Sequence, residues 1–300
     1  MVSRRLFTAS DPRWLFAHLA GLFLLFLMVC PALHAHSDLS LQIDELSRQL
    51  ESETDNPELL LRRGDLQRRH ENWDLARADF TKVREVQPEN PTVDWFEGRM
   101  EVEAGRPLEG VELLDRFLLT QPHQAIALQN RAQGYLQLEL PLLAARDLQT
   151  VIRVSDNPAP ALYSASALAF VAAGPDYFPD AMIVSNQGLS IFPGEIVLTG
   201  IATDLSLAQA DTDTASQLIG QLPDSIQNLP QWQTRILLLD CQSGGAPDVS
   251  SALKASPASR SSSGLLSEES LTRLTGEPSA EDCQAAALAI LTGRLNVTPH

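Results

Sequence analysis

Apolar residues recur every three or four positions along much of the chain, which is the spacing of an amphipathic helix. The first such stretch is Asp38 to Glu53, where Leu39, Ile43, Leu46 and Leu50 share one helix face. A solitary helix of this kind suits the end of an array, because it covers an apolar face that would otherwise be exposed. We therefore predict a capping helix within residues 36–56.

From residue 57 the helical pattern is divided into units of equal length. Prolines mark the divisions, because proline suits the first turn of a helix and interrupts a helix interior. Glycines recur inside the units at the same interval. The pairs separated by 34 residues are Gly64 with Gly98, Pro88 with Pro122, and Asn56-Pro57 with Asn90-Pro91.

Small and large residues also recur in phase across three units, residues 57–90, residues 91–124, and Ala125 to about Pro158. Small residues allow two helices to approach closely, and large residues fill the space between them. The small ones are Gly64, Ala76, Gly98, Gly110, Ala132 and Ala144, and the large ones are Leu60, Phe80, Leu114, Leu128, Tyr135 and Leu148.

This phased pattern resembles the tetratricopeptide repeat (TPR) family. The resemblance implies an all-α fold, a solenoid of helical hairpins wound as a right-handed superhelix. Two degenerate pairs follow in residues 159–228, and the first two expected helices there are Ala161 to Ala173 and Pro179 to Phe192. Glu195 to Ala208 and Thr212 to Leu222 form the next pair. Residues 229–300 are a divergent helical region with a Ser-rich loop at 255–264, and its helices are expected at Trp232 to Cys241, Ser267 to Leu274 and Ala280 to Leu295.

The N-terminus is typical of an export signal. Three arginines in the first 13 residues precede an apolar run from Trp14 to Val29, and Ala35 offers a small residue before a cleavage point. Residues 1–35 are therefore predicted to be a signal peptide, which places the protein in the periplasm or outside the cell. An alternative stays open, since Trp14 to Leu33 is about as long as the ~20 residues that span a bilayer, and would anchor the chain in the inner membrane.

The composition favours packed helices and excludes some partners. The chain is 44% hydrophobic and only 6% aromatic, and its net charge is −16. Such an acidic surface repels nucleic acid and anionic lipid. The charge is uneven, because arginines are concentrated between Arg62 and Arg116, whereas Asp156 to Asp248 is almost purely acidic except for Arg235.

Two cysteines remain after residue 35, Cys241 and Cys283. An oxidising compartment favours a disulfide between them, and neither belongs to a CxxC metal or redox pair. Two buried thiols that act as small apolar side chains are the alternative.

Motifs for catalysis or cofactor binding are not found in the sequence. It contains no phosphate loop, dinucleotide fingerprint, nucleophile elbow or HExxH. No histidine has a second ligand at metal spacing, so we expect no metal and no cofactor. The sequence therefore indicates a protein that is not an enzyme.

A protein or peptide partner is what the TPR resemblance implies, because in that family the first helix of each repeat lines a concave groove. Trp95 and the arginines have the character of interface anchors, although Trp95 also suits packing between repeats. The candidate groove residues are Leu61, Asp65, Arg68, Arg69, Trp95, Arg99, Val102, Gln129, Gln133 and Leu136.

The leading hypothesis is a non-catalytic scaffold in the cell envelope that holds a protein or peptide partner in this groove. Two alternatives are a membrane-anchored assembly factor for an envelope complex and the regulatory subunit of an enzyme. The identity of the partner and the oligomeric state stay undetermined by the sequence.

Overall fold

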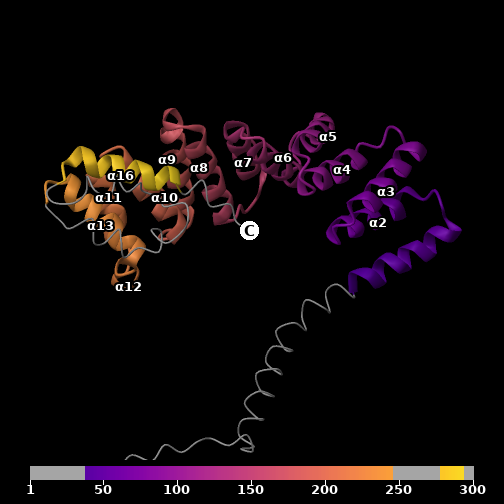
Figure 1. Cartoon of the computed structure of the whole chain (residues 1–300), viewed down its shortest axis with the longest axis horizontal. Helices are drawn as coiled ribbons and strands as arrows, with labels where there is room; N and C mark the ends of the chain where they lie inside the picture. Colours follow the sequence, from indigo (N-terminus) through magenta and orange to yellow (C-terminus); the bar gives the residue numbers. More distant parts are fainter. Residues whose placement is uncertain (1–37, 246–277, 294–300) are drawn as a thin grey trace, which may run out of the picture. The chain divides into compact units, whose positions relative to one another are not determined.

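The computed structural model describes residues 38–245 and 278–293 (Figure 1). Within these ranges the chain is helical and contains no strand, so the all-α prediction is confirmed. The predicted signal peptide, the Ser-rich loop 255–264 and the helix expected at Ser267 to Leu274 lie outside the described residues. The chain divides into two compact units, the first ending at Met100 and the second beginning at Glu101.

The first unit begins with a helix over residues 38–52, here called the capping helix. It is followed by α2 (Pro57–Arg69), α3 (Trp73–Val86) and most of α4 (Thr92–Glu103). Asn56 starts α2, because its side-chain oxygen accepts hydrogen bonds from the backbone N–H groups of Glu58 (3.0 Å) and Leu59 (3.3 Å). Pro57 follows at the first helical position, where its missing N–H costs nothing.

The core of the first unit lies between these helices. Leu46 and Leu50 of the capping helix pack with Leu60 of α2, Phe80 of α3 and Met100 of α4. The capping helix is also joined to α2 by polar contacts, since the Arg63 guanidinium donates a hydrogen bond to Ser47 Oγ (3.2 Å). The helix therefore covers the first hairpin, as its apolar stripe predicts.

Gly64 allows the close approach of α2 and α3. A Cβ atom at this position would lie 2.5 Å from Cε1 of Phe80, a ring that is fully buried. Gly64→Ala is therefore expected to lower the free energy of unfolding by about 1–3 kcal/mol through overpacking, as measured by urea denaturation.

The matched control for this substitution is Gly220→Ala. Gly220 ends α11, and an added Cβ there would meet no atom within 4 Å. Equal destabilisation by the two substitutions would contradict the packing explanation for Gly64.

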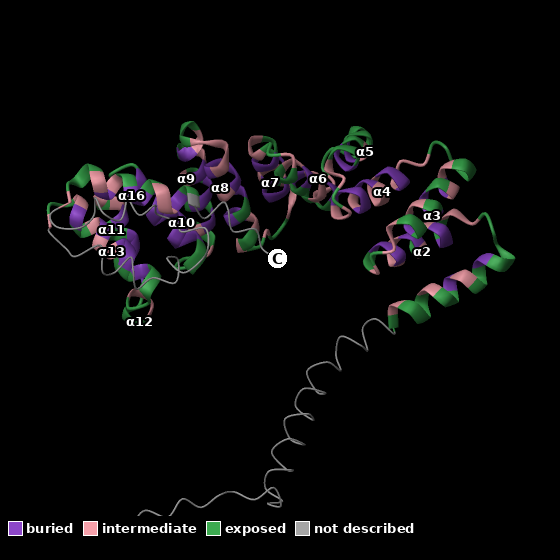
Figure 2. Ribbon diagram, in the orientation of Figure 1, coloured by how far each residue is buried: buried purple, intermediate pink, exposed green. Residues whose placement is uncertain are grey.

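The second unit continues the hairpin pattern. Its helices are α5 (Pro107–Thr120), α6 (Ala125–Gln137), α7 (Pro141–Val154), α8 (Pro160–Ala173), the short η1 (Pro175–Tyr177), α9 (Phe178–Ile191), α10 (Ile196–Ala208), α11 (Thr212–Gly220), α12 (Asp224–Gln227), α13 (Pro230–Gln242) and α16 (Ala280–Gly293). Neighbours along the chain pack against each other from α5 to α11. The buried residues lie on the sides where these helices face one another (Figure 2).

The helix α10 is enclosed by other helices along most of its length. Every residue from Leu198 to Ala208 is buried. It packs against α8, α9, α11 and α13, and also against α16, which comes from the end of the chain. The sequence predicts α10 and α11 as a degenerate repeat, but it gives no sign that a C-terminal helix covers α10.

Candidate protein-binding surface

The helix α2 presents a mixed polar and apolar face. Arg62, Asp65, Leu66 and Arg69 follow one another at intervals of three or four residues, which places them in one row along the helix. Arg62 and Arg69 are exposed, whereas Asp65 and Leu66 are half-buried. Leu61, another predicted groove residue, is half-buried and packs against the apolar core of the first unit.

Arg68 is not available to a partner, so this part of the groove prediction is wrong. Its side chain is only 5% exposed and its Nε donates a hydrogen bond to Asp65 Oδ1 (2.9 Å). The pairing follows from the spacing, because residues three apart on a helix lie side by side. The Arg68 side chain is therefore held against α2 by its ion pair with Asp65.

On α4, Trp95 and Arg99 are half-buried. The Trp95 ring lies against that of Phe96, with centroids 4.9 Å apart, and Phe96 in turn packs on the core of the first unit. Trp95 thus packs on a neighbour within α4 and leaves part of its ring exposed.

Val102 is wrong as a groove residue, because it is a core residue with 1% of its surface exposed. It lies opposite Gly134 of α6, where an added Cβ would come within 3.1 Å of Val102 Cγ2 and 2.7 Å of Val111 Cγ2. The glycine lets α6 pack closely at this point, which buries the end of α4.

The helix α6 keeps an uncovered row of side chains. Gln129, Gln133 and Leu136 are all exposed, and Ile126 continues the row toward the start of the helix. The opposite side of α6 is buried, with Leu128, Ala132 and Gly134 against α5 and α7. The three predicted groove residues of α6 are therefore accessible.

A pocket of about 460 Å³ lies between the capping helix and α2. The capping helix contributes one side, α2 the other, and the ring of Phe96 from α4 completes the lining. The lining residues are Leu41, Gln42, Glu45, Leu46, Gln49, Arg62, Asp65, Leu66 and Phe96. The sequence predicts Asp65 at this surface but gives no sign of a pocket, because the placement of the capping helix creates it.

Two bidentate ion pairs recur at equivalent positions of the first and third repeats. Arg63 binds Asp79 through two hydrogen bonds (2.6 and 2.9 Å), and Arg131 binds Asp147 in the same way (2.7 and 2.8 Å). Each pair joins the first helix of a hairpin to the second. The signal for them is present in the sequence, since both partners recur after two repeat lengths.

A buried ion pair holds α10 to α13. Nε and Nη2 of Arg235 donate hydrogen bonds to Asp204 at 2.7 and 3.0 Å, and both side chains are at most 5% exposed. The Arg235 guanidinium also lies 4.5 Å from the ring centroid of Trp232. Burial raises the pKa of the Asp204 carboxyl above its ordinary value, and the charge and hydrogen bonds of Arg235 oppose that rise.

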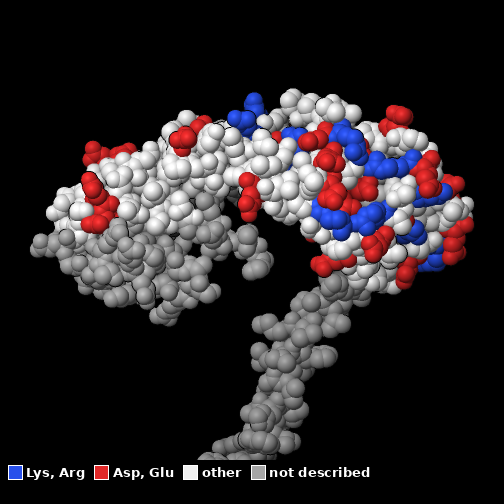
Figure 3. Space-filling model, turned by 45° about the horizontal axis from the view of Figure 1, so that its top comes forward, with Lys and Arg blue, Asp and Glu red and all other residues white. Residues whose placement is uncertain are grey.

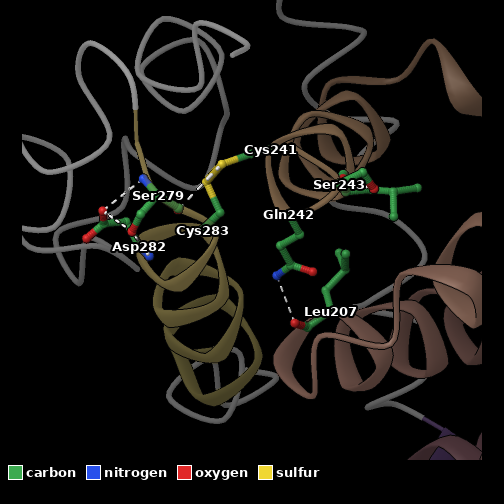
Figure 4. The surroundings of a disulfide bond; sticks show 8 residues. Leu207, Cys241, Gln242, Ser243, Ser279, Asp282 and Cys283 are labelled. Atoms are coloured by element: carbon green, nitrogen blue, oxygen red, sulfur yellow. Dashed lines mark hydrogen bonds between the residues drawn. A yellow bond between two sulfur atoms is a disulfide. The ribbon is translucent and has the colours of Figure 1, made fainter. Parts of the chain in front are cut away.

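Cys241 of α13 and Cys283 of α16 are joined by a disulfide in the structure, with Cα atoms 6.3 Å apart (Figure 4). Ser279 and Asp282 form a reciprocal cap at the start of α16, where Ser279 N donates to Asp282 Oδ2 (3.0 Å) and Asp282 N to Ser279 Oγ (3.2 Å). The Gln242 side-chain amide donates to the Leu207 carbonyl (2.9 Å). The disulfide thus attaches α16 to α13, and the Gln284 side-chain amide of α16 donates directly to the Ala208 carbonyl of α10 (3.0 Å).

Charged side chains are concentrated over the N-terminal helices, as Figure 3 shows on one face of the molecule. The helices α8, α9, α10 and α11 contain no lysine or arginine. Within residues 38–245 and 278–293, no group of three or more His, Cys, Asp or Glu side chains is placed to hold a metal ion. No helix in those ranges is both long enough and apolar enough to span a membrane.

The arrangement of helices matches solved structures of repeat proteins. YrrB, a TPR protein with an unusual peptide-binding site, superposes with a TM-score of 0.50 at 14% identity, over 59% of this chain and 89% of YrrB. PilW, a type IV pilus biogenesis factor, gives a TM-score of 0.51 at 18% identity, over 67% of this chain and 91% of PilW. The chain has the TPR fold. No family model matches its sequence, and no curated protein is significantly similar to it.

The first helices of successive hairpins are α2, α4, α6, α8 and α10. Of these, α2 and α6 keep exposed side chains along one face, whereas α16 packs on both α8 and α10. The C-terminal helix thus covers part of α8 and of α10.

Proposed function

We propose that this protein is a non-catalytic scaffold of the cell envelope, which holds a protein or peptide partner on the first helices of its N-terminal repeats. The observation that supports this most directly is the uncovered row Ile126, Gln129, Gln133 and Leu136 on α6. It combines apolar surface with amide groups that donate and accept hydrogen bonds, a composition suited to a polypeptide ligand. The fold shared with YrrB, a TPR protein with a peptide-binding site, supports the same conclusion.

The location in the envelope rests on the sequence of residues 1–35. Their arginines, apolar run and small residue at Ala35 fit an export signal, and the disulfide between Cys241 and Cys283 suits an oxidising compartment. The alternative function, a membrane-anchored assembly factor, keeps the same binding surface and differs in retaining the segment from Trp14 to Leu33. N-terminal sequencing of the protein purified from its host separates the two.

Photo-crosslinking tests the binding surface. A photoreactive amino acid at Gln133, on the first helix α6, is expected to capture a specific protein in the native host. The same amino acid at Gln187, an exposed position on the second helix α9, is the matched control. Mass spectrometry identifies what each position captures.

The proposal predicts a product enriched at Gln133 over Gln187. Identical products at the two positions, or none at Gln133 or at a second groove position such as Gln129, would show that the first helices do not bind the partner.

A further inference from the structure

We propose that the pocket between the capping helix and α2 binds an acidic peptide segment that carries an apolar side chain between two carboxylates. The apolar side chain enters the pocket, and the carboxylates bind Arg62 and Arg69. This inference rests on the proposed function, and it names the chemistry of the partner at one part of the surface.

The unpaired charges around the pocket are positive, which favours the binding of an anion. Its two carboxylates already have partners, because Glu45 is paired with Arg48 and Asp65 with Arg68. Arg62, which also lines the pocket, is exposed and forms no ion pair with any described residue. Arg69 is likewise exposed and unpaired within residues 38–245 and 278–293. An incoming carboxylate therefore meets guanidinium groups that no carboxylate of the described residues occupies.

The apolar part of the pocket can bind an apolar side chain in addition to a carboxylate. Leu41 is 66% exposed at its rim, and Leu46, Leu66 and Phe96 lie along the lining. A volume of about 460 Å³ has room for a large side chain together with adjoining backbone. Burying such a side chain against these residues supplies the non-polar share of the binding free energy.

The spacing of the two arginines selects the length of the segment. Arg62 and Arg69 are seven residues apart on α2, which corresponds to roughly 10 Å along the helix axis. An extended peptide advances about 3.3 Å per residue, so carboxylates three residues apart match this distance. The sequence Glu-Phe-Leu-Glu satisfies both the spacing and the apolar requirement.

Nucleic acid is disfavoured as the occupant. The chain has a net charge of −16, which repels a long polyanion, whereas a short peptide experiences chiefly the local charge of the two arginines. The apolar rim also lacks the run of basic side chains that follows a phosphate backbone.

The test measures binding of a fluorescent, N-acetylated and C-amidated peptide, Ser-Glu-Phe-Leu-Glu-Ser, to the full chain by anisotropy. Binding is expected to weaken about tenfold or more when Arg62→Glu is introduced, and to weaken as salt is raised. The control is Arg146→Glu on α7, because Arg146 is an exposed arginine that does not line the pocket, and it is expected to change binding by less than about twofold.

A second pair of variants tests the apolar contact. Leu41→Ser is expected to weaken binding severalfold, while Leu75→Ser, an exposed leucine of α3 outside the pocket, leaves it unchanged. Both leucines are largely exposed, so neither substitution threatens folding, and circular dichroism of each variant checks this.

Four results would overturn the inference. The first is no measurable binding of the acidic peptide. The second is equal binding of a control peptide in which glutamine replaces both glutamates (Gln-Phe-Leu-Gln), and the third is an equal effect of Arg62→Glu and Arg146→Glu. Tighter binding of Gln-Phe-Leu-Gln with a free C-terminus than of the amidated acidic peptide would also overturn it, because the site would then recognise a chain end. If a specific partner is still captured at Gln133 in any of these cases, the proposed function survives and only the chemistry assigned to the pocket fails.

Discussion

Asp204→Ala is expected to lower the free energy of unfolding by about 3–5 kcal/mol. The substitution leaves the guanidinium of Arg235 charged, 5% exposed and without the carboxylate that accepts two of its hydrogen bonds. Burial raises the pKa of Asp204, so the attraction of Arg235 is what keeps this carboxylate charged. Removing Asp204 loses that attraction and leaves the desolvation cost of the buried guanidinium uncompensated. Urea denaturation followed by circular dichroism measures the difference.

Two controls separate this effect from the loss of any carboxylate. Asp213→Ala removes an exposed carboxylate from α11 and is expected to cost less than about 0.5 kcal/mol. The double substitution Asp204→Leu, Arg235→Met removes both charges and is expected to recover most of the stability, since apolar replacements of a buried pair are often neutral. Equal costs for Asp204→Ala and Asp213→Ala would show that the pair does not hold α10 to α13.

Reduction of the disulfide is expected to have the second largest effect. The bond connects residues 42 apart in sequence, and a closed loop of that size corresponds to about 2–4 kcal/mol of stability. The double variant Cys241→Ser, Cys283→Ser should show the same loss without reductant. Hydrogen exchange of α16 amides is expected to accelerate more than that of α6 amides, because the bond attaches α16 directly to α13.

The reductant supplies the control within one protein. Added reductant should destabilise the natural chain and leave the double serine variant unchanged. Unchanged stability and unchanged exchange of α16 in the reduced natural chain would mean that packing alone holds the helix in place.

Much of the fold can be predicted from the sequence, because the 34-residue repeat places small and large residues at the same positions of each helical hairpin. Gly64 and Phe80 occupy the small and large positions that the 34-residue pattern assigns, and the structure places one directly against the other. The prolines that open α2, α5, α7, α8 and α13 give the helix starts, since proline is tolerated at the first turn and disfavoured further in. Local signals of this kind can be recognised in the sequence without any information about tertiary contacts.

The candidate surface is harder to predict from the sequence, because the exposure of a side chain depends on which helices pack next to it. Val102 shares a helix face with Trp95 and Arg99 by spacing, yet it is buried because Gly134 lets α6 approach the end of α4. Arg68 is turned toward Asp65, a choice of partner that the sequence leaves open. The pairing of Arg235 with Asp204 joins residues 31 apart in sequence. The 34-residue repeat pattern does not predict this contact.

The position of α16 has a consequence for competition. A partner that required the surfaces of α8 and α10 would first have to displace a helix of the same chain, whose effective concentration is high because the disulfide attaches it to α13. The apparent affinity of such a partner would equal its intrinsic affinity multiplied by the fraction of molecules in which α16 is released. In the intact chain α16 therefore disfavours ligands of α8 and α10, whereas the proposed partner surface on α2 and α6 keeps its exposed side chains.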